Sequence, residues 1–342
     1  MIRPAQRTRL VAVALIIGLL YLFARHVDWR AAADAARGAD ARLLALAFLL
    51  NQLSLIAKGV RWWVFLRPLG VRSLSLVLGA TYAGASLNNL VIAQGGEAAR
   101  AMIVARASGV PAPRVASALA LERALDGVSY LTLLAAAALL PDLPPSLGRW
   151  RVAVFAALAC SVIALVALGA TSRVPVGEVS QGTTRWARVR SGTRSFVASI
   201  REAATPSRLG IALMLSLIAW TLQVLTYHTI ALATHLPMPL VGSVAAMLAI
   251  GISFLFRGTP GNVGIFQVIY AVTAGSFGVG RPAAVATALL IQAVQIVPTV
   301  AVGTLAAHWL VTRGRRATTM PRGASRPCPS SGIPCPRTTS SP

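Results

Sequence analysis

The sequence contains little charge and almost no lysine. Only 12% of its 342 residues are charged, while 56% are apolar and the mean hydropathy is +0.70. Soluble domains are typically about 25% charged and about 45–50% apolar. Lys58 is the only lysine, although the chain has 32 basic and 9 acidic side chains and a net charge of +23. This composition excludes a soluble enzyme with a charged shell.

Common catalytic and structural motifs are also missing. The only lysine is followed by glycine, which excludes a Walker A loop. Cys328 and Cys335 do not have a zinc-binding spacing, and three cysteines cannot form a disulfide framework. The four histidines form no metal-binding pattern, and no Gly-x-Ser-x-Gly elbow is present. We therefore expect no enzyme, no cofactor and no metal site.

Long apolar runs dominate what is present. A membrane-spanning helix needs about 20 apolar residues. We therefore expect an all-α, polytopic integral membrane protein with seven to nine transmembrane helices. Two segments rich in Gly, Ser, Thr and Asn, residues 73–92 and 261–280, could instead be re-entrant or broken helices. The candidate segments are 10–24, 42–57, 73–92, 115–140, 151–171, 209–234, 239–256, 261–280 and 283–311.

Arginine is unevenly distributed between these segments. Residues 172–208 contain seven arginines and two glutamates, and residues 58–72 contain four basic side chains and no acid. The turns at 141–150 and 235–239 are poor in charge. The positive-inside rule therefore predicts cytoplasmic basic loops and cytoplasmic N- and C-termini in a cell (cytoplasmic) membrane. Because the arginines are spread between apolar runs, we expect lipid rather than nucleic acid as the partner.

The chain divides into two regions by composition. Residues 1–312 form the predicted transmembrane domain. Residues 313–342 contain six prolines and six arginines among Ser and Thr, and they cannot bury a core. We expect this segment to be a disordered, basic cytoplasmic tail, and its arginines could also bind anionic lipid.

The transmembrane domain contains a candidate internal repeat, with halves around 73–140 and 239–311. Residues 115–122 align with residues 285–292, with four identities at an offset of 170. A glycine-rich break precedes each stretch, Gly95-Gly96 in the first half and Pro260-Gly261-x-x-Gly264 in the second. Paired interrupted segments point to a transport site near the middle of the membrane, where half-helix N-termini favour an anionic group.

Charged residues occur inside one apolar segment. Segment 115–140 contains Glu122, Arg123 and Asp126, and charges at this depth are costly unless they are paired or face water. Glu122 and Asp126 share one helix face, and Arg123 can pair with Asp126. The net charge of −1 requires a further cation, for which Arg100 and Arg257 are the candidates. The cluster is either a polar site in a water-filled cavity or a structural salt bridge between helices.

A second pair of charges lies in the first break. Glu97 and Arg100 are separated by three residues and could pair with each other. The alternative is an interfacial pair at a helix start, where glutamate is favoured by the helix dipole.

These motifs resemble those of the flippase-like family named for the transmembrane region of lysylphosphatidylglycerol synthase. The resemblance rests on Gly96-Glu97-x-x-Arg100, Leu121-Glu122-Arg123-x-x-Asp126 and Pro260-Gly261-x-x-Gly264, and it covers about residues 10–311. The sequence departs from the family pattern at Gln94, where a proline is usual, and at Gln267, where an acid is common. No soluble aminoacyltransferase domain accompanies these motifs, so we do not expect synthase activity.

The resemblance implies a lipid flippase or scramblase that acts on anionic or polyprenyl-linked lipids. Two alternatives remain open: an integral-membrane enzyme that acts on lipid phosphates, and a non-transporting partner of a cell-envelope glycosyltransferase. The expected substrate-binding residues are Glu97, Arg100, Glu122, Arg123, Asp126 and Arg257, and the expected backbone breaks are at Gly95, Gly96, Pro260, Gly261 and Gly264.

Overall fold

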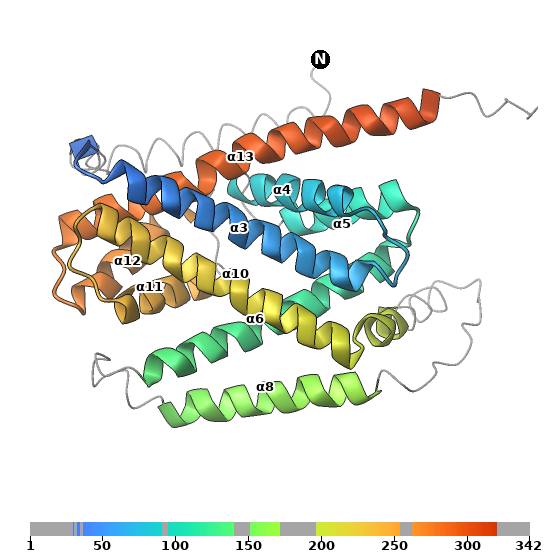
Figure 1. The fold of residues 1–342 in the computed structure, drawn as a ribbon, viewed down its shortest axis with the longest axis horizontal. Helices are drawn as coiled ribbons and strands as arrows, with labels where there is room; N and C mark the ends of the chain where they lie inside the picture. The colour runs from blue at the N-terminus through green and yellow to red at the C-terminus, as the bar shows by residue number, and fades with distance from the viewer. Residues whose placement is uncertain are drawn as a thin grey trace, which may run out of the picture.

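The fold is built from helices packed side by side (Figure 1). The computed structural model describes residues 30, 33–34, 37–90, 95–139, 151–171, 196–253 and 262–319, and these contain helices and no strands. This confirms the all-α class. The expected first segment, 10–24, lies outside the described residues.

Five helices are long. They are α3 (Ala41–Leu66), α6 (Ala112–Ala138), α8 (Arg151–Thr171), α10 (Pro206–Ala233) and α13 (Arg281–Thr319). By length and composition, α3, α10 and the Arg281–Leu310 part of α13 are suited to cross a membrane. The starts of α3 and α10 follow from local sequence. Asp40 caps α3 by accepting hydrogen bonds from the backbone N–H groups of its first turn, and Pro206 occupies the first turn of α10, where no donor is lost.

Four helices are short: α4 (Leu74–Leu90), α5 (Gly95–Ser108), α11 (Leu240–Ser253) and α12 (Ile265–Gly275). At 1.5 Å per residue, an 11- or 14-residue helix is only about 16–21 Å long, less than the bilayer core of about 30 Å. They occur as two pairs, each followed by a long helix. A glycine with positive φ precedes each long helix, Gly109 (72°) before α6 and Gly278 (80°) before α13. The two predicted repeat halves therefore have the same order of elements.

Packing produces two buried apolar cores. Helix α3 lies along α10 in the opposite direction, and the backbone N–H of Asp40 donates to the carbonyl of Ala233 where the start of one meets the end of the other (Figure 1). One core gathers around Trp62, Phe65 and Leu125, and the second gathers around Tyr270.

Helix α8 is at the periphery of this bundle (Figure 1). Its apolar side chains are largely exposed, including Val152 at 81% and Ile163 at 67%. Such a surface is unfavourable in water and suited to lipid. The composition, the helices and this outer surface describe a multi-pass membrane protein.

The structure moves two predicted boundaries. The expected span 42–57 was wrong at its end, because α3 continues to Leu66 and carries Lys58 and Arg61 inside the bundle. Helix α13 continues to Thr319, into the segment that we expected to be a tail. Residues 320–342 lie outside the described residues.

Candidate functional site

Arg61 lies at the centre of a buried ion network. Its Nη2 is 2.7 Å from Oε1 of Glu122, and its Nη1 is 2.6 Å from Oδ1 of Asp126. Nη1 also donates to the hydroxyl of Ser216 at 2.6 Å. The arginine side chain is fully buried. One guanidinium group therefore connects α3, α6 and α10.

The helical spacing of the two acids explains this geometry. Glu122 and Asp126 are four residues apart, so both carboxylates project from the same face of α6, as the sequence predicted. A guanidinium can donate to two carboxylates at once through its planar set of N–H groups. Removing these charges from water is costly, and mutual pairing offsets that cost.

Arg100 and Arg123 bring α5 into the network. Arg100 Nη2 is 2.8 Å from Oε2 of Glu122, and Arg123 Nη1 is 3.3 Å from Oδ2 of Asp126. Arg123 also forms an ion pair with Glu97. The predicted Arg123–Asp126 pair and the expected role of Arg100 as an added cation are thus confirmed.

The expected pairing of Glu97 with Arg100 was wrong. Within the described part of the chain, each of these residues pairs with α6, Glu97 with Arg123 and Arg100 with Glu122. The antiparallel approach of α5 and α6 offers each group an opposite charge from the other helix. Arg257, Pro260 and Gly261 lie outside the described residues.

The glycines of the two breaks lie at helix starts, but side chains already bind their N–H groups. Gly96 is in the first turn of α5, which begins at Gly95, and its N–H donates to Oδ1 of Asn88 at 2.8 Å. Gly264, with φ of 93°, precedes α12, and its N–H donates to Oε1 of Gln267 at 2.7 Å. The side-chain oxygens of Asn88 and Gln267 therefore cap the starts of α5 and α12 in this structure.

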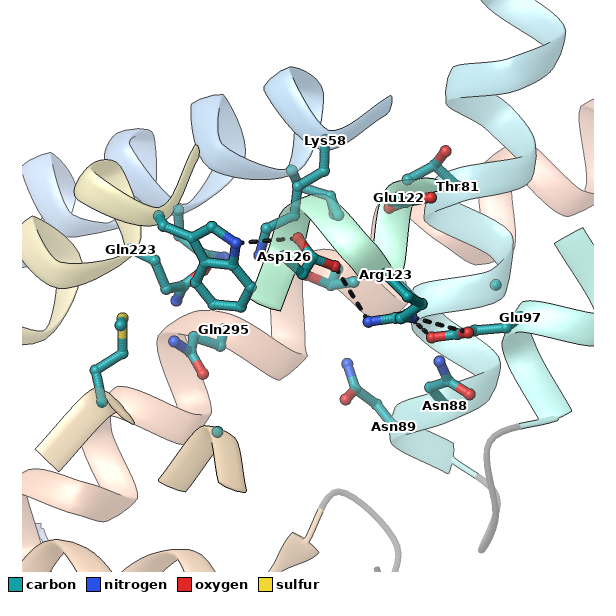
Figure 2. A pocket seen from close by; sticks show the side chains of 18 of the residues that line it. Lys58, Thr81, Asn88, Asn89, Glu97, Glu122, Arg123, Asp126, Gln223 and Gln295 are labelled. Carbon is teal, nitrogen blue, oxygen red and sulfur yellow. Dashed lines mark hydrogen bonds and ion pairs between the residues drawn. The ribbon is translucent and has the colours of Figure 1, made fainter. Parts of the chain in front are cut away.

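The polar residues border a cavity of about 400 Å³ (Figure 2). Figure 2 shows Glu97, Arg123 and Asp126 on one side, with Asn89 and Gln295 reaching toward the same space. Helices α3, α4, α5, α6, α10, α11 and α13 all contribute to its wall. The polar and aromatic lining residues are Asn51, Lys58, Thr81, Asn88, Asn89, Glu97, Arg100, Glu122, Arg123, Asp126, Tyr130, Trp220, Gln223, Tyr227, Gln295 and Thr299.

Lys58 is placed differently from the arginines. Its Nζ lies 4.2 Å from the ring centroid of Trp220, and Trp220 Nε1 donates to Oδ1 of Asp126 at 3.0 Å. Among the residues that the structure describes, Lys58 forms no ion pair, whereas each arginine of the network does. The network has four cations and three acids, so it carries a net positive charge.

Sequence reasoning missed Lys58, Arg61, Ser216 and Trp220 as site residues. The two basic residues were assigned to a loop because their charge ends the apolar run. A helical period was nevertheless present, since Asn51, Lys58 and Arg61 are spaced by seven and three residues and lie on one side of α3. That polar stripe could have revealed both cations, whereas nothing in the local sequence marked Ser216 or Trp220.

The carboxylates of the site are occupied by cations. Glu97, Glu122 and Asp126 each pair with at least one arginine. Across the described ranges, His, Cys, Asp and Glu form no group of three or more that could hold a metal ion. The arrangement is suited to binding a polar or anionic group, because its N–H donors and its excess charge face a cavity.

Comparison with known proteins agrees with the motifs. The family described as "Lysylphosphatidylglycerol synthase TM region" matches residues 9–303. A protein named glycosyltransferase AglD, from Haloferax volcanii, is 26% identical over an alignment 343 residues long, which covers 88% of this chain. The alignment covers 55% of AglD, so the chain spans about half the length of this relative. Because the family match covers most of its length, the chain belongs to the family of the lysylphosphatidylglycerol synthase transmembrane region.

Proposed function

We propose that the protein is a lipid flippase or scramblase that moves anionic lipids, including polyprenyl-linked ones, between the two leaflets of the membrane. The observation that carries this proposal is a polar cavity of about 400 Å³, with an excess of cations, inside a bundle of apolar helices. Family membership supports a membrane protein of this kind.

The head group is the part of a lipid that crosses the hydrocarbon core of the membrane at the greatest cost in free energy. A charged group in hydrocarbon loses its hydration, at a cost of several kcal/mol or more. Charged and amide side chains around the cavity replace water for that group. The acyl chains need no such shelter, since the exposed faces of α8 and α13 are apolar and suited to lipid. The proposed pathway therefore encloses the head group and leaves the chains in the bilayer.

Transport accounts for the three acids better than catalysis does. An enzyme acting on lipid phosphates would need a carboxylate to bind metal or transfer a proton. Glu122 is held by two guanidinium groups, and Asp126 is held by one of these, by a third guanidinium group and by Trp220. With these contacts the acids position cations, and we propose no chemical step. The energy for net movement would then come from a gradient or from consumption of the moved lipid.

The relative named as a glycosyltransferase favours a second candidate function. Only about half of that protein corresponds to this chain. A transmembrane unit of this type could serve as a non-transporting partner of a cell-envelope glycosyltransferase. In that case purified protein would bind its partner and move no lipid.

The decisive experiment blocks the cavity without changing its charge. Leu55 lines the cavity on α3, and Leu53 on the same helix is 51% exposed. We expect Leu55→Trp to lower the rate of movement of fluorescent phosphatidylglycerol in proteoliposomes at least tenfold, because indole fills the space a head group needs. The matched variant Leu53→Trp faces outward and should retain the wild-type rate.

Two results would contradict the proposal. Wild-type protein could fail to move any anionic or polyprenyl-linked lipid above the rate of empty liposomes. Alternatively, Leu55→Trp could move lipid as fast as Leu53→Trp while both variants remain monodisperse in detergent.

A further inference from the structure

We propose that Lys58 is the residue that binds the phosphate of the transported lipid, and that the three arginines of the network remain paired with its three acids. This assignment rests on the proposed function and names the substrate class as lipid phosphates. It differs from the expectation drawn from the sequence, in which the arginines themselves contact the ligand.

The arginines are already committed to carboxylates. Arg61 binds both Glu122 and Asp126 and is fully buried. Arg100 binds the remaining oxygen of Glu122, with its guanidinium 4.7 Å from the ring centroid of Trp62. A phosphate that took either arginine would remove one of the two cations that pair with the buried Glu122, which is unfavourable for that carboxylate.

Arg123 is also balanced, although it is more exposed. Its side chain is 54% exposed and pairs with both Glu97 and Asp126. A phosphate near Arg123 would meet two carboxylates as well as the guanidinium. The local charge there does not favour a second anion.

Lys58 provides the positive charge that the acids do not balance. It lines the cavity, and its described neighbours offer it an aromatic ring in place of a carboxylate. The ring itself is fixed, because Trp220 Nε1 donates to Asp126. Phosphate offers the ammonium a full negative charge and oxygens that accept its hydrogen bonds, which a cation–π contact lacks, so an arriving phosphate can bind it. The ammonium has three N–H donors for phosphate oxygens.

The surroundings of Lys58 are suited to the rest of a head group. Asn51 and Lys58 lie on the cavity side of α3, and Gln223 and Trp220 lie opposite them on α10. Amide side chains both donate and accept hydrogen bonds, and they can therefore bind ester oxygens or hydroxyl groups beside a phosphate. The same chemistry is found in phosphatidyl lipids and polyprenyl phosphates.

The unique lysine permits a direct binding experiment on the full-length protein in detergent. Acetic anhydride acetylates amines, and Lys58 is the only lysine side chain it can modify. Peptide mass spectrometry measures the rate at Lys58, with the N-terminal amine as the internal reference. We expect phosphatidylglycerol or a short polyprenyl phosphate to slow acetylation of Lys58 at least fivefold, and a phosphate-free galactosyl diacylglycerol to leave it unchanged. The phosphate lipid that protects more strongly identifies the preferred source.

Transport by variants gives the second readout. Lys58→Gln removes the charge, Lys58→Arg retains it, and Arg42→Gln removes an exposed charge from the first turn of the same helix. We expect Lys58→Gln to reduce movement of phosphatidylglycerol at least tenfold, Lys58→Arg to restore part of the rate, and Arg42→Gln to have no effect. If Lys58→Gln does not fold, protection from acetylation in the wild type still decides the assignment.

The outcomes separate this inference from the function on which it rests. If the wild type moves lipid and Lys58→Gln moves it equally fast, the assignment of Lys58 is wrong and the flippase stands. Equal acetylation of Lys58 with all three lipids also overturns the assignment. If phosphate lipids protect Lys58 but the wild type moves none of them, the phosphate site stands and the transport function is wrong.

Discussion

Arg61 connects three helices of the site, α3, α6 and α10, through one side chain. It is fully buried, and it is the common partner of Glu122 and Asp126. Without it, two neighbouring carboxylates on one face of α6 would repel each other in a place with little water. The Nε of Arg61 has no hydrogen-bond partner among the described atoms, so the side chain is held entirely through its two terminal nitrogens.

We therefore predict that Arg61→Met destabilises the protein by about 3–5 kcal/mol, the cost of removing one partner from a buried ion pair. Arg123→Met should cost far less, because Arg123 is half-exposed and exposed ion pairs contribute about 0–1 kcal/mol. Thermal unfolding in detergent measures the difference in stability. The readout is the loss of the monodisperse peak in size-exclusion chromatography as the temperature rises. Equal losses in both variants would show that burial of Arg61 does not govern stability.

A double substitution provides the control for this prediction. Combining Arg61→Met with Asp126→Asn removes both charges of their ion pair, while Glu122 retains Arg100. Replacing both partners of a buried ion pair is often close to neutral, so the double variant should recover much of the lost stability. If it is no more stable than Arg61→Met, the loss comes from packing and not from charge.

The sequence predicted part of this residue-level picture. The spacing of Glu122 and Asp126 was sufficient to place both acids on one face and to pair Arg123 with Asp126. The pairing of Glu97 with Arg123 could not be predicted in the same way, because it depends on how α5 meets α6. Lys58 and Arg61 were missed because hydropathy treats a charge as the end of a span, whereas a buried network allows the helix to continue.

At the scale of helices, close contact between α4 and α13 is a second determinant of the fold. Ser86 Oγ donates to the carbonyl of Thr299 at 2.7 Å, next to Pro298 inside α13. A methyl group on Gly303 would overlap the Ser86 hydroxyl and the Tyr82 carbonyl. In membranes, small residues allow such close approach and supply much of the packing.

We predict that Gly303→Ala separates α13 from α4 and lowers the thermal unfolding midpoint. The matched control is Gly127→Ala in α6, where the added methyl group meets no atom within 4 Å. Alanine is favoured over glycine inside a helix by about 0.5–1 kcal/mol, so the control should be neutral or stabilising. Equal unfolding midpoints for the two variants would contradict close packing at Gly303.

The helices themselves could be predicted from the sequence with mixed success. The apolar runs 151–171 and 209–234 correspond closely to α8 and α10. Helix α5 was missed as a separate element because it has Glu97, Arg100 and Arg106 within 14 residues and no apolar run. Its position depends on ion pairs with α6, and hydropathy analysis does not detect ion pairs.

At the scale of the whole molecule, the two ends of the bundle differ in charge. The end where α3, α5 and α8 finish and α6 and α10 begin has six arginines and one glutamate among its described residues: Arg67, Arg72, Arg106, Arg114, Arg201, Arg208 and Glu202. The opposite end has five arginines and two aspartates: Arg30, Arg37, Arg42, Arg151, Arg281, Asp34 and Asp40. The last turns of α13 extend toward the first end (Figure 1).

The charge difference predicts that the arginine-rich end faces the cytoplasm, because cytoplasmic loops retain excess Lys and Arg. Ala107 is exposed at that end, at the close of α5, and Pro237 is exposed at the other end, between α10 and α11. In a background with Cys160, Cys328 and Cys335 changed to serine, we expect Pro237→Cys in intact cells to react with a membrane-impermeant maleimide. Ala107→Cys should react only after the membrane is opened, since the reagent would otherwise have to cross the bilayer. The reverse pattern would invert the orientation and place the Arg114–Glu202 ion pair, which joins α6 to the segment before α10, on the outer face.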